Sequence, residues 1–245
     1  MTMPTHTGRF LTAEWRYLLM LNFEVDPSLV APYVPRGTEI DFWNGKTFVS
    51  LVGFRFLSTR VLGMPIPFHR DFDEINLRFY VSRREGDELR RGVVFIKEIV
   101  PRGMISCVAR TVYNENYVTR RMRHELQIPA SDTPGRVQYE WRHQGQWNRI
   151  GATFAGEPTF ARPDSEETFI TEHYRGYTRQ RDGGTIEYEV QHPTWRVWQA
   201  TDLIVDGAVS VEYGGEFATV LAQTPSSAFV ADGSAIVVHR GRRIA

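Results

Sequence analysis

Between residues 74 and 81 the chain alternates strictly between polar and apolar side chains. Successive side chains of an extended strand point to opposite faces, so a period of two predicts a β-strand with two different faces. One face would carry Ile75, Leu77, Phe79 and Val81, and the other Glu74, Asn76, Arg78 and Tyr80. Segments of this kind fold only as parts of sheets, and this constrains the fold more than any other feature.

Strand-like segments recur along the chain without the regular helix spacing of a β-α-β protein. They cover residues 15–25, 38–42, 46–57, 74–81, 92–100, 117–126, 136–142, 148–156, 185–191, 195–205 and 235–239. Helical spacing is predicted over residues 28–33, over residues 101–114, and after Asp164 as the capping residue. These segments, about ten strands and two or three helices, predict a mostly β (α+β) fold.

The connections add two expectations. The Asn44-Gly45 pair predicts a hairpin turn between the strands over residues 38–42 and 46–57. The long connection over residues 58–72 is typical of a lid or a pocket wall. No linker or repeat divides the chain, so we expect one domain over residues 1–245, with residues 1–10 as a loose N-terminal arm.

The charge balance argues against several kinds of partner. Basic and acidic residues number 29 each, so no general field attracts nucleic acid or an anionic membrane. The apolar stretches are too short to span a bilayer, and the N-terminus lacks the pattern of a signal peptide. We therefore expect a cytoplasmic protein that binds neither nucleic acid nor membrane. Whether it forms a homo-oligomer stays open.

Two lysines, Lys46 and Lys97, are the only amine side chains in the sequence. Lys97 would lie in mid-strand on the same face as Phe95 and Ile99. Burial there would lower the pKa of its amine and make it nucleophilic. The alternative is a structural ion pair with a carboxylate. Lys46 begins a strand beside a turn and would be solvated.

A second group of candidates lies in the last third of the chain. His192 precedes a proline, which holds it extended, and Trp195 could form a pocket wall. His192 would transfer protons, or would be a hydrogen-bonded structural histidine. Either Glu172 or His173 would reach the pocket while Tyr174 packs beside them, and Glu172 would orient His192 or share its charge. The histidines show no metal-ligand spacing and Cys107 lies in no nucleophile motif, so we expect neither a metal nor another cofactor.

Several of these segments resemble, in order and spacing, the YqjF-like proteins, an uncharacterised bacterial family. They are the opening segment Trp15-Arg16-Tyr17, then Val25-Asp26-Pro27, Ile75-Asn76-Leu77-Arg78-Phe79, Phe169-Ile170-Thr171-Glu172-His173-Tyr174, and His192-Pro193-Thr194-Trp195. That family is placed in the acetoacetate-decarboxylase-like superfamily. The resemblance implies a closed antiparallel β-barrel with two or three short helices and an internal cavity.

The resemblance also bears on chemistry. In the decarboxylases a pair of lysines shortly after a central strand forms the Schiff base, but the corresponding stretch here, residues 101–105, has no lysine. Arg16 matches an arginine that binds the substrate carboxylate in those enzymes.

Residues and resemblance together predict a pocket for a small organic acid. Arg16, Asn76, Arg78, Tyr174 and Trp195 would bind the acid, and His192, Glu172 and Lys97 would carry any catalysis. The first hypothesis is a cofactor-independent, lyase-like enzyme acting on a small keto or aromatic acid. The alternative is a non-catalytic binding or sensing protein that uses the same pocket.

Overall fold

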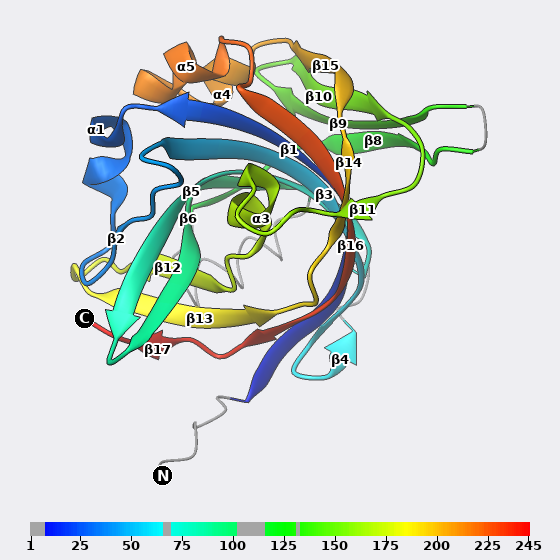
Figure 1. The fold of residues 1–245 in the computed structure, drawn as a ribbon. Coiled ribbons are helices and arrows are strands. Elements are labelled where there is room, and N and C mark those ends of the chain that lie inside the picture. Colours follow the sequence, from blue (N-terminus) through cyan, green and yellow to red (C-terminus); the bar gives the residue numbers. More distant parts are fainter. Residues whose placement is uncertain (1–7, 66–69, 102–115, 131–132) are drawn as a thin grey trace.

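The strand-like segments of the sequence form two sheets in the computed structural model (Figure 1). The structure describes residues 8–65, 70–101, 116–130 and 133–245. Over these residues the architecture is mostly β with a few short helices, as the sequence predicts. None of the helices in these ranges has the length and apolar character needed to cross a membrane.

The larger sheet has 13 strands among the described residues. Its main path runs β11 (Thr159–Phe160), β14 (Arg196–Gln199), β16 (Ser227–His239), β1 (Arg9–Val25), β3 (Thr47–Val61), β5 (Phe72–Glu85), β6 (Glu88–Val100), β12 (Arg175–Arg179), β13 (Thr185–Gln191), β17 (Arg242–Arg243). Three short strands join it at the side: β2 (Glu39–Ile40), β4 (Met64–Pro65) and β7 (Tyr117–Thr119).

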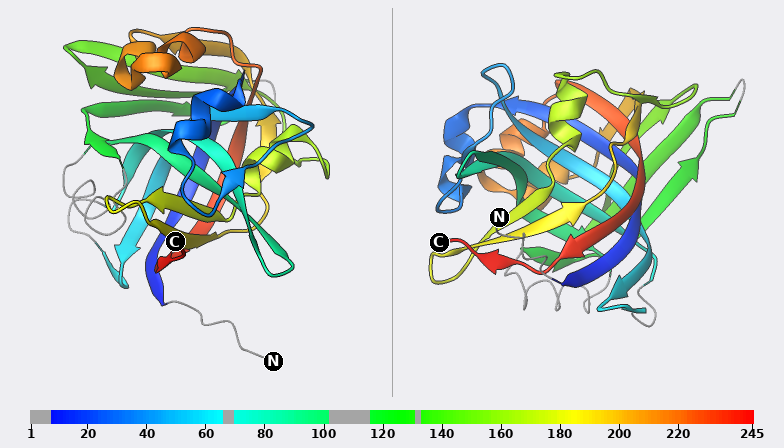
Figure 2. Two further views of the ribbon diagram at one scale, coloured as in Figure 1. Left: turned by 90° about the vertical axis from the view of Figure 1, so that its left-hand side faces the viewer. Right: turned by 60° about the horizontal axis from the view of Figure 1, so that its bottom comes forward.

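The large sheet curves strongly, so that β13, in yellow, comes to lie beside β16, in red (Figures 1 and 2). Val190 and Gln191 of β13 pair with Val238 and Val237 of β16. The strand pairings therefore lead from β16 through β1, β3, β5, β6, β12 and β13 back to β16. The pairing of β6 with β12, and that of β6 with β7, is parallel. The antiparallel arrangement that the resemblance implies therefore does not hold at these two places, whereas the other strand pairings among the described residues are antiparallel.

A second, four-stranded sheet packs on the outer side of the first one. Its order is β15 (Thr201–Asp206), β10 (Gln146–Phe154), β9 (Gly135–His143) and β8 (Met122–Gln127). The two sheets approach closely because Gly53 of β3 has no side chain. A Cβ at that position would lie 2.6 Å from Cδ2 of Tyr139, whose hydroxyl donates to the backbone oxygen of Tyr17 at 2.8 Å.

Two short helices extend this outer layer. They are α4 (Val209–Tyr213) and α5 (Gly215–Leu221), and their apolar residues Val209, Phe217 and Leu221 join the core between the sheets. The sequence analysis did not predict either helix. Each is too short to show a helical stripe, and its stability comes from this packing.

Strand β5 confirms the predicted alternation, but both of its faces are buried. Ile75, Leu77 and Phe79 are fully buried in the core between the two sheets. The polar residues of the opposite face point into the concave side of the large sheet, and Asn76 and Arg78 expose only 2% and 8% of their surface. A period of two distinguishes the faces of a strand but cannot say whether the polar face meets water.

The remaining helices lie at the ends of strands. The segment predicted over residues 28–33 forms α1 (Pro27–Val30) and a 3-10 turn (Ala31–Tyr33). The later helix is α3 (Glu166–Thr171), whose N-cap is Ser165 and not Asp164, because the Ser165 hydroxyl accepts from the Thr168 amide. Figure 1 shows α3 on the concave side of the large sheet.

Several predicted boundaries need correction. Strand β1 begins at Arg9, so the last part of the expected N-terminal arm belongs to the sheet. Part of the connection over residues 58–72 is strand, because β3 reaches Val61, β4 covers Met64–Pro65 and β5 begins at Phe72. The Asn44-Gly45 turn is closed only by a bridge between Trp43 and Lys46, since β2 pairs with β5 instead of β3. The helix predicted over residues 101–114 lies outside the described residues.

Two predicted strands are each divided between the sheets. Residues 117–126 form β7 and β8, and residues 195–205 form β14 and β15. In both cases the first part joins the large sheet and the second part joins the small one. Strand β12 was not predicted.

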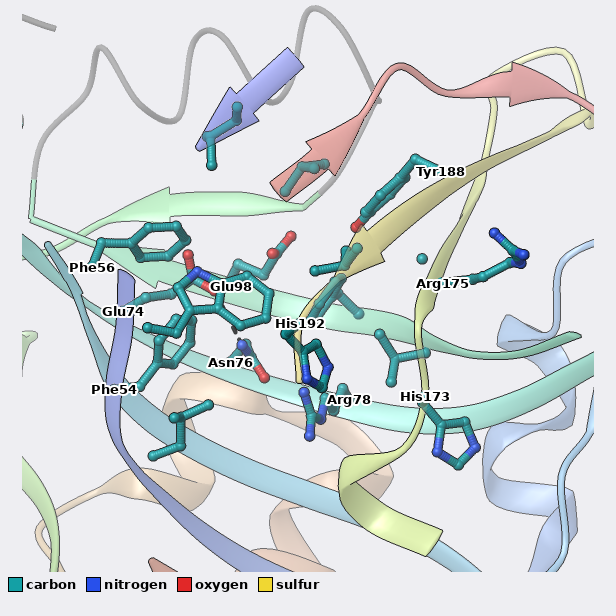
Figure 3. A pocket seen from close by; sticks show the side chains of 18 of the residues that line it. Phe54, Phe56, Glu74, Asn76, Arg78, Glu98, His173, Arg175, Tyr188 and His192 are labelled. Carbon is teal, nitrogen blue, oxygen red and sulfur yellow. Dashed lines mark hydrogen bonds between the residues drawn. The ribbon is translucent and has the colours of Figure 1, made fainter. Parts of the chain in front are cut away.

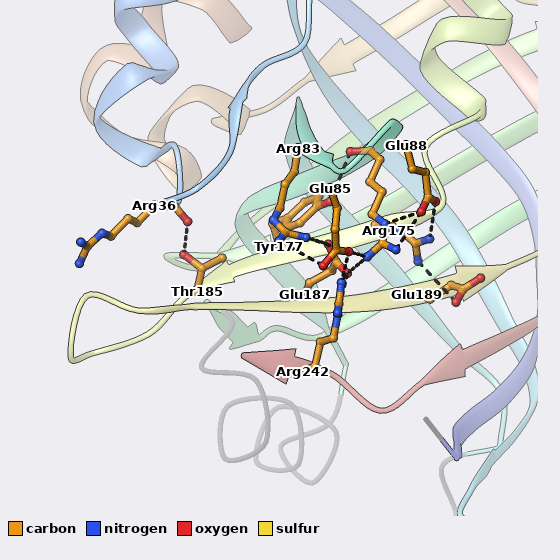
Figure 4. A network of polar contacts seen from close by, with 11 residues as sticks. Arg36, Arg83, Glu85, Glu88, Arg175, Tyr177, Thr185, Glu187, Glu189 and Arg242 are labelled. Atoms are coloured by element: carbon orange, nitrogen blue, oxygen red, sulfur yellow. Dashed lines mark hydrogen bonds and ion pairs between the residues drawn. The ribbon is translucent and has the colours of Figure 1, made fainter. Parts of the chain in front are cut away.

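Polar contacts hold the C-terminal strand β17 to the β5–β6 hairpin (Figure 4). Glu187 of β13 is buried and forms ion pairs with Arg83, Arg90 and Arg242. Arg242 also pairs with Glu85 at the end of β5. Because a buried carboxylate is stable only when it is paired, these arginines fix three separate parts of the chain to one another.

Candidate functional site

A pocket of about 130 Å³ lies on the concave side of the large sheet (Figure 3). Strands β1, β3, β5, β6 and β13 and the segment around α3 contribute to its wall. Much of the lining is aromatic and includes Trp15, Phe54, Phe56, Phe72, Phe95 and Trp195. Pockets of this kind take their affinity from apolar burial and their specificity from a few polar groups.

Strand β5 supplies three of those polar groups from one face. The Asn76 amide nitrogen donates to the Glu74 carboxylate at 3.0 Å, and the Tyr117 hydroxyl donates to its other oxygen at 3.3 Å. Arg78 follows two residues further along the strand, and Figure 3 shows Glu74, Asn76 and Arg78 in sequence along the pocket. The strand geometry fixes their order, and the hydrogen bonds fix the orientation of the Asn76 amide.

Arg78 is a buried cation without an ion pair among the described residues. Its Nη2 reaches the Ile170 carbonyl at 3.5 Å and the Met20 sulfur at 3.8 Å, and its Nε has no hydrogen-bond partner in that part of the chain. The Tyr80 ring lies 5.8 Å from its guanidinium carbon. A buried charge is costly when it is not paired, so this guanidinium is well suited to bind an anion.

His192 lies above Arg78 in the same pocket (Figure 3). Its ring stacks on Trp195, with centroids 4.1 Å apart and planes 17° apart. Its Nδ1 lies 2.9 Å from the Pro193 carbonyl. Because a carbonyl only accepts, Nδ1 carries the proton and Nε2 keeps its lone pair. Burial and the nearby Arg78 charge lower the His192 pKa to about 4, despite the opposing hydrogen bond to Pro193.

Glu172 and Tyr174 lie beside this wall and are not among the lining residues. Glu172 is the C-cap of α3, and its carboxylate accepts a hydrogen bond from the Tyr174 hydroxyl. Burial, and then Glu172 itself, raises the Tyr174 pKa to about 12. The Tyr174 ring contacts His192 at a centroid distance of 4.6 Å. The expected contact between Glu172 and His192 is therefore replaced by one through Tyr174.

Lys97 does not face the pocket. Its amine donates to the Glu212 carbonyl and lies 3.5 Å from the Glu212 carboxylate, on the outer side against α4. The reason is a bulge in β6: Leu77 pairs with Lys97, but Arg78 pairs with Phe95, so Ile96 is an extra residue. Phe95 lines the pocket, and the bulge turns Lys97 to the other face.

Arg16 also faces away from the pocket, and a bulge follows it. The register between β1 and β3 shifts after Arg16, and Tyr17 has a φ of 55°. Trp15 lines the pocket, so alternation along β1 turns Arg16 to the opposite face, where it bonds to Glu14. Because of the bulge, Leu18 lines the pocket as well. The expected role of Arg16 as the carboxylate-binding residue therefore finds no support in its position.

Of the eight residues predicted for the site, the structure brings Asn76, Arg78, His192 and Trp195 together in the wall of the pocket. The polar lining residues that sequence reasoning missed include Glu74, Glu98, Tyr117, Arg175 and Tyr188. The alternation over residues 74–81 puts Glu74 on the same face as Asn76 and Arg78, so the sequence pattern could have identified Glu74 as a lining residue. The others come from strands and turns that only the fold brings to the pocket.

His173, the alternative to Glu172 in the sequence analysis, lines the pocket where Glu172 does not. Its Nε2 lies 3.0 Å from the Asp41 carboxylate, and burial lowers its pKa although Asp41 opposes this shift. Figure 3 shows its ring turned away from Arg78 and His192. Within the described ranges, no group of three or more potential ligands could hold a metal ion. The polar groups of the pocket are suited to organic ligands that form hydrogen bonds and ion pairs.

Comparison with known proteins agrees with the fold. A model of the DUF2071 family, described as an uncharacterized conserved protein, matches residues 12–235. The uncharacterized protein YqjF of Bacillus subtilis (strain 168) is 28% identical over 204 residues, which cover 82% of this chain and 80% of YqjF.

Solved structures with the same fold include several enzymes. Acetoacetate decarboxylase from Legionella pneumophila subsp. pneumophila str. Philadelphia 1 matches with a TM-score of 0.68 at 10% identity, over 100% of this chain and 91% of that one. The enduracididine biosynthesis enzyme MppR, complexed with pyruvate, matches with a TM-score of 0.68 at 12% identity, over 100% and 93%. An acetoacetate decarboxylase-like enzyme from Sphingomonas wittichii RW1 matches with a TM-score of 0.63 at 13% identity, over 97% and 94%.

At these identities the structural likeness concerns the fold, whereas the family match covers most of the chain. The protein belongs to the DUF2071 family, is YqjF-like, and has the acetoacetate decarboxylase-like fold.

Proposed function

We propose that this protein binds a small organic acid in the pocket and that Arg78 holds the acid's carboxylate. The observation that carries the proposal is that Arg78 is a buried cation in the pocket wall, unpaired among the described residues. It is 8% exposed and lines the pocket. A ligand carboxylate would supply the missing negative charge through two parallel hydrogen bonds, which the planar guanidinium is suited to form.

The surroundings of Arg78 support an acid with an apolar part. Trp15, Phe54 and Trp195 line the same pocket and would cover that part of the ligand. In this proposal the strands from β16 to β13 form a closed barrel within one domain, and the pocket is its internal cavity. The pairing of β13 with β16 supports this view. The pyruvate complex of MppR shows that a protein of this fold binds a small organic acid.

Any catalysis would proceed without a Schiff base. The sequence contains only Lys46 and Lys97, and neither lines the pocket. Lys46 pairs with Glu24 at the surface, and Lys97 is held by Glu212. This arrangement favours a protein that binds or senses an acid, or an enzyme that relies on proton transfer alone.

One observation favours the enzyme. Glu74 is buried in the pocket near Arg78, and Asn76 and Tyr117 both donate to its carboxylate. A carboxylate held in this way can act as a general base toward a ligand placed by Arg78. The enzyme would then be a cofactor-independent, lyase-like catalyst that uses Glu74 and the His192 lone pair, without Lys97.

The test of binding is a thermal-shift screen of small carboxylic acids, followed by calorimetry on each hit. A ligand at about a hundred times its dissociation constant adds roughly 2.7 kcal/mol to the stability of the folded state. We expect a hit with the wild type and with Arg16→Gln, and its loss in Arg78→Met. The Arg16 variant is the matched control because Arg16 lies on the same sheet but faces away from the pocket.

The proposal fails if no acid stabilises the wild type, or if Arg78→Met binds the hit as tightly as the wild type does. Turnover of each hit is then followed by proton NMR. An enzyme would lose turnover in Glu74→Gln while keeping affinity for the acid. A binding protein would show no turnover with any hit.

A further inference from the structure

The hydrogen-bonding groups around Arg78 constrain which organic acid fits the pocket. This inference rests on the proposed function, because it takes the ligand carboxylate to be bound by Arg78. It concerns the group next to that carboxylate. A keto group only accepts hydrogen bonds, whereas a hydroxyl also donates one.

Asn76 offers an acceptor beside Arg78. Its amide nitrogen is used by Glu74 at 3.0 Å, and since a carboxylate only accepts, the orientation of the amide is fixed. Its Oδ1 is buried and has no hydrogen-bond partner among the residues that the structure describes. Leaving a buried acceptor unpaired is unfavourable, so this atom favours a ligand that donates a hydrogen bond.

His192 offers a second acceptor on the other side. Its Nδ1 donates to the Pro193 carbonyl, which leaves the lone pair of Nε2 for a ligand. The ring cannot turn freely, because it is stacked on Trp195 and also contacts Tyr174. Figure 3 shows the His192 ring above Arg78, with Asn76 beside them.

Together these three residues present a cation flanked by two hydrogen-bond acceptors. A keto acid would bring its carbonyl oxygen toward two groups that cannot donate to it. A hydroxy acid would donate its hydroxyl proton to Asn76 Oδ1 or to His192 Nε2 while its carboxylate stays on Arg78. Asn76 and Arg78 are neighbours on one face of β5, so a hydroxyl next to the carboxylate can reach Asn76 while the carboxylate is bound by Arg78.

We propose that the pocket selects carboxylic acids with a hydroxyl group next to the carboxylate, in preference to the corresponding keto acids. The aromatic lining formed by Trp15, Phe54 and Trp195 favours acids with an apolar or aromatic substituent.

The probes are three acids with one carbon skeleton: mandelate, benzoylformate and phenylacetate. Mandelate carries the hydroxyl, phenylacetate has hydrogen in its place, and benzoylformate carries a keto group that cannot enolise and therefore only accepts. Lactate, pyruvate and propionate repeat the comparison without the ring. Calorimetry measures each dissociation constant with the wild-type protein and with the variants Asn76→Leu, His192→Phe, Arg78→Met and Arg16→Gln.

We expect one enantiomer of the hydroxy acid to bind at least about tenfold more tightly than its keto and deoxy counterparts, as one matched hydrogen bond in a buried site allows. Asn76→Leu or His192→Phe should remove most of this preference and leave the affinity for the deoxy acid nearly unchanged. Phenylalanine keeps the ring that stacks on Trp195, so the second variant preserves the wall. Arg16→Gln should behave as the wild type.

The outcomes separate this inference from the proposed function. If all three acids bind with equal affinity and Arg78→Met abolishes binding, the carboxylate site stands and the preference for hydroxy acids is wrong. Tighter binding of the keto acid would also overturn the preference. If no acid binds, or if binding survives Arg78→Met, the proposed function itself fails.

Discussion

The imidazole of His192 stacks on the indole of Trp195, with ring centroids 4.1 Å apart and ring planes 17° apart. Trp195 is itself fixed, because its Nε1 donates to the Ser234 hydroxyl at 2.9 Å. The stack therefore holds the histidine ring at a set orientation in the pocket. It also removes much of the ring from water, which favours the neutral form of the imidazole.

His192 should remain neutral well below the usual range for histidine. Burial and Arg78 lower its pKa from 6.5 to about 4. In the unfolded chain His192 has its ordinary pKa of 6.5, so between about pH 6.5 and pH 4 the unfolded state binds a proton that the folded state does not. This group therefore makes the folded state less stable as the pH falls through that range. A ring nitrogen NMR titration of the folded protein checks this. A midpoint near 6.5 would contradict it, and His192→Phe identifies the signal.

Replacing Arg78 should not harm the fold. Its guanidinium is buried without an ion pair among the described residues, so Arg78→Met removes an unfavourable burial of charge and keeps similar volume. We expect the free energy of unfolding to stay the same or to rise by about 1 kcal/mol or more. Urea denaturation of the ligand-free protein measures it. A loss of several kcal/mol would mean that Arg78 has a structural role.

The carboxylate of Glu212 should be the most sensitive ionic group in the outer layer. This carboxylate is buried. Its oxygens lie 3.0 Å from an Arg120 guanidinium nitrogen, 2.7 Å from His143 Nδ1 and 3.5 Å from the Lys97 amine. Glu212→Gln leaves the arginine and lysine without their shared anionic partner, and we expect a loss of about 3–5 kcal/mol in the free energy of unfolding.

Lys97→Met removes only one of the three partners of Glu212 and tests a separate point. We expect it to cost much less stability than Glu212→Gln, because Arg120 and His143 still pair with Glu212. Ligand affinity and any turnover should be unchanged, since the amine lies outside the pocket. If Lys97→Met bound the ligand normally but lost turnover, the Lys97 amine would be a catalytic group after all. Calorimetry and NMR on the same variant decide between these outcomes.

Acid should weaken the contacts that hold β17. A hydrogen bond from Arg242, helped by Arg83, lowers the Glu85 pKa from 4.5 to about 2. A lowered carboxyl pKa stabilises the folded state above about pH 4.5, and this contribution is lost as the pH falls toward 2. The melting temperature of Glu85→Gln should therefore depend less on pH between 4.5 and 2 than that of the wild type. Parallel curves for the two proteins would exclude this contribution.

A side chain at position 176 should disturb the pocket. Gly176 pairs with Tyr188 across β12 and β13, and a Cβ at this glycine would lie 2.1 Å from Cζ of Tyr188. Gly176→Ala must displace the Tyr188 ring, which lines the pocket. We expect at least about tenfold weaker ligand binding, equivalent to roughly 1.4 kcal/mol. Tyr188→Phe, which keeps the ring in place, serves as the control.

The local pattern of side chains was enough to predict much of the sheet. The alternation over residues 74–81 identified β5 and put Asn76 and Arg78 on one face, where the structure has them. Short elements were harder to predict: α4, α5 and β12 are too brief to show a period, and they form because other elements cover them.

The sequence by itself determined that the chain is mostly β and which side chains share a face within an unbroken strand. Only the tertiary structure decided which faces meet in the pocket. The bulge at Ile96 turns Lys97 outward, and the one at Tyr17 puts Leu18 in the pocket although Arg16, two residues earlier, faces outward. Both bulges depend on the register with neighbouring strands. One extra residue reverses every later side chain of a strand, so a local pattern read without its partners assigns such residues to the wrong side.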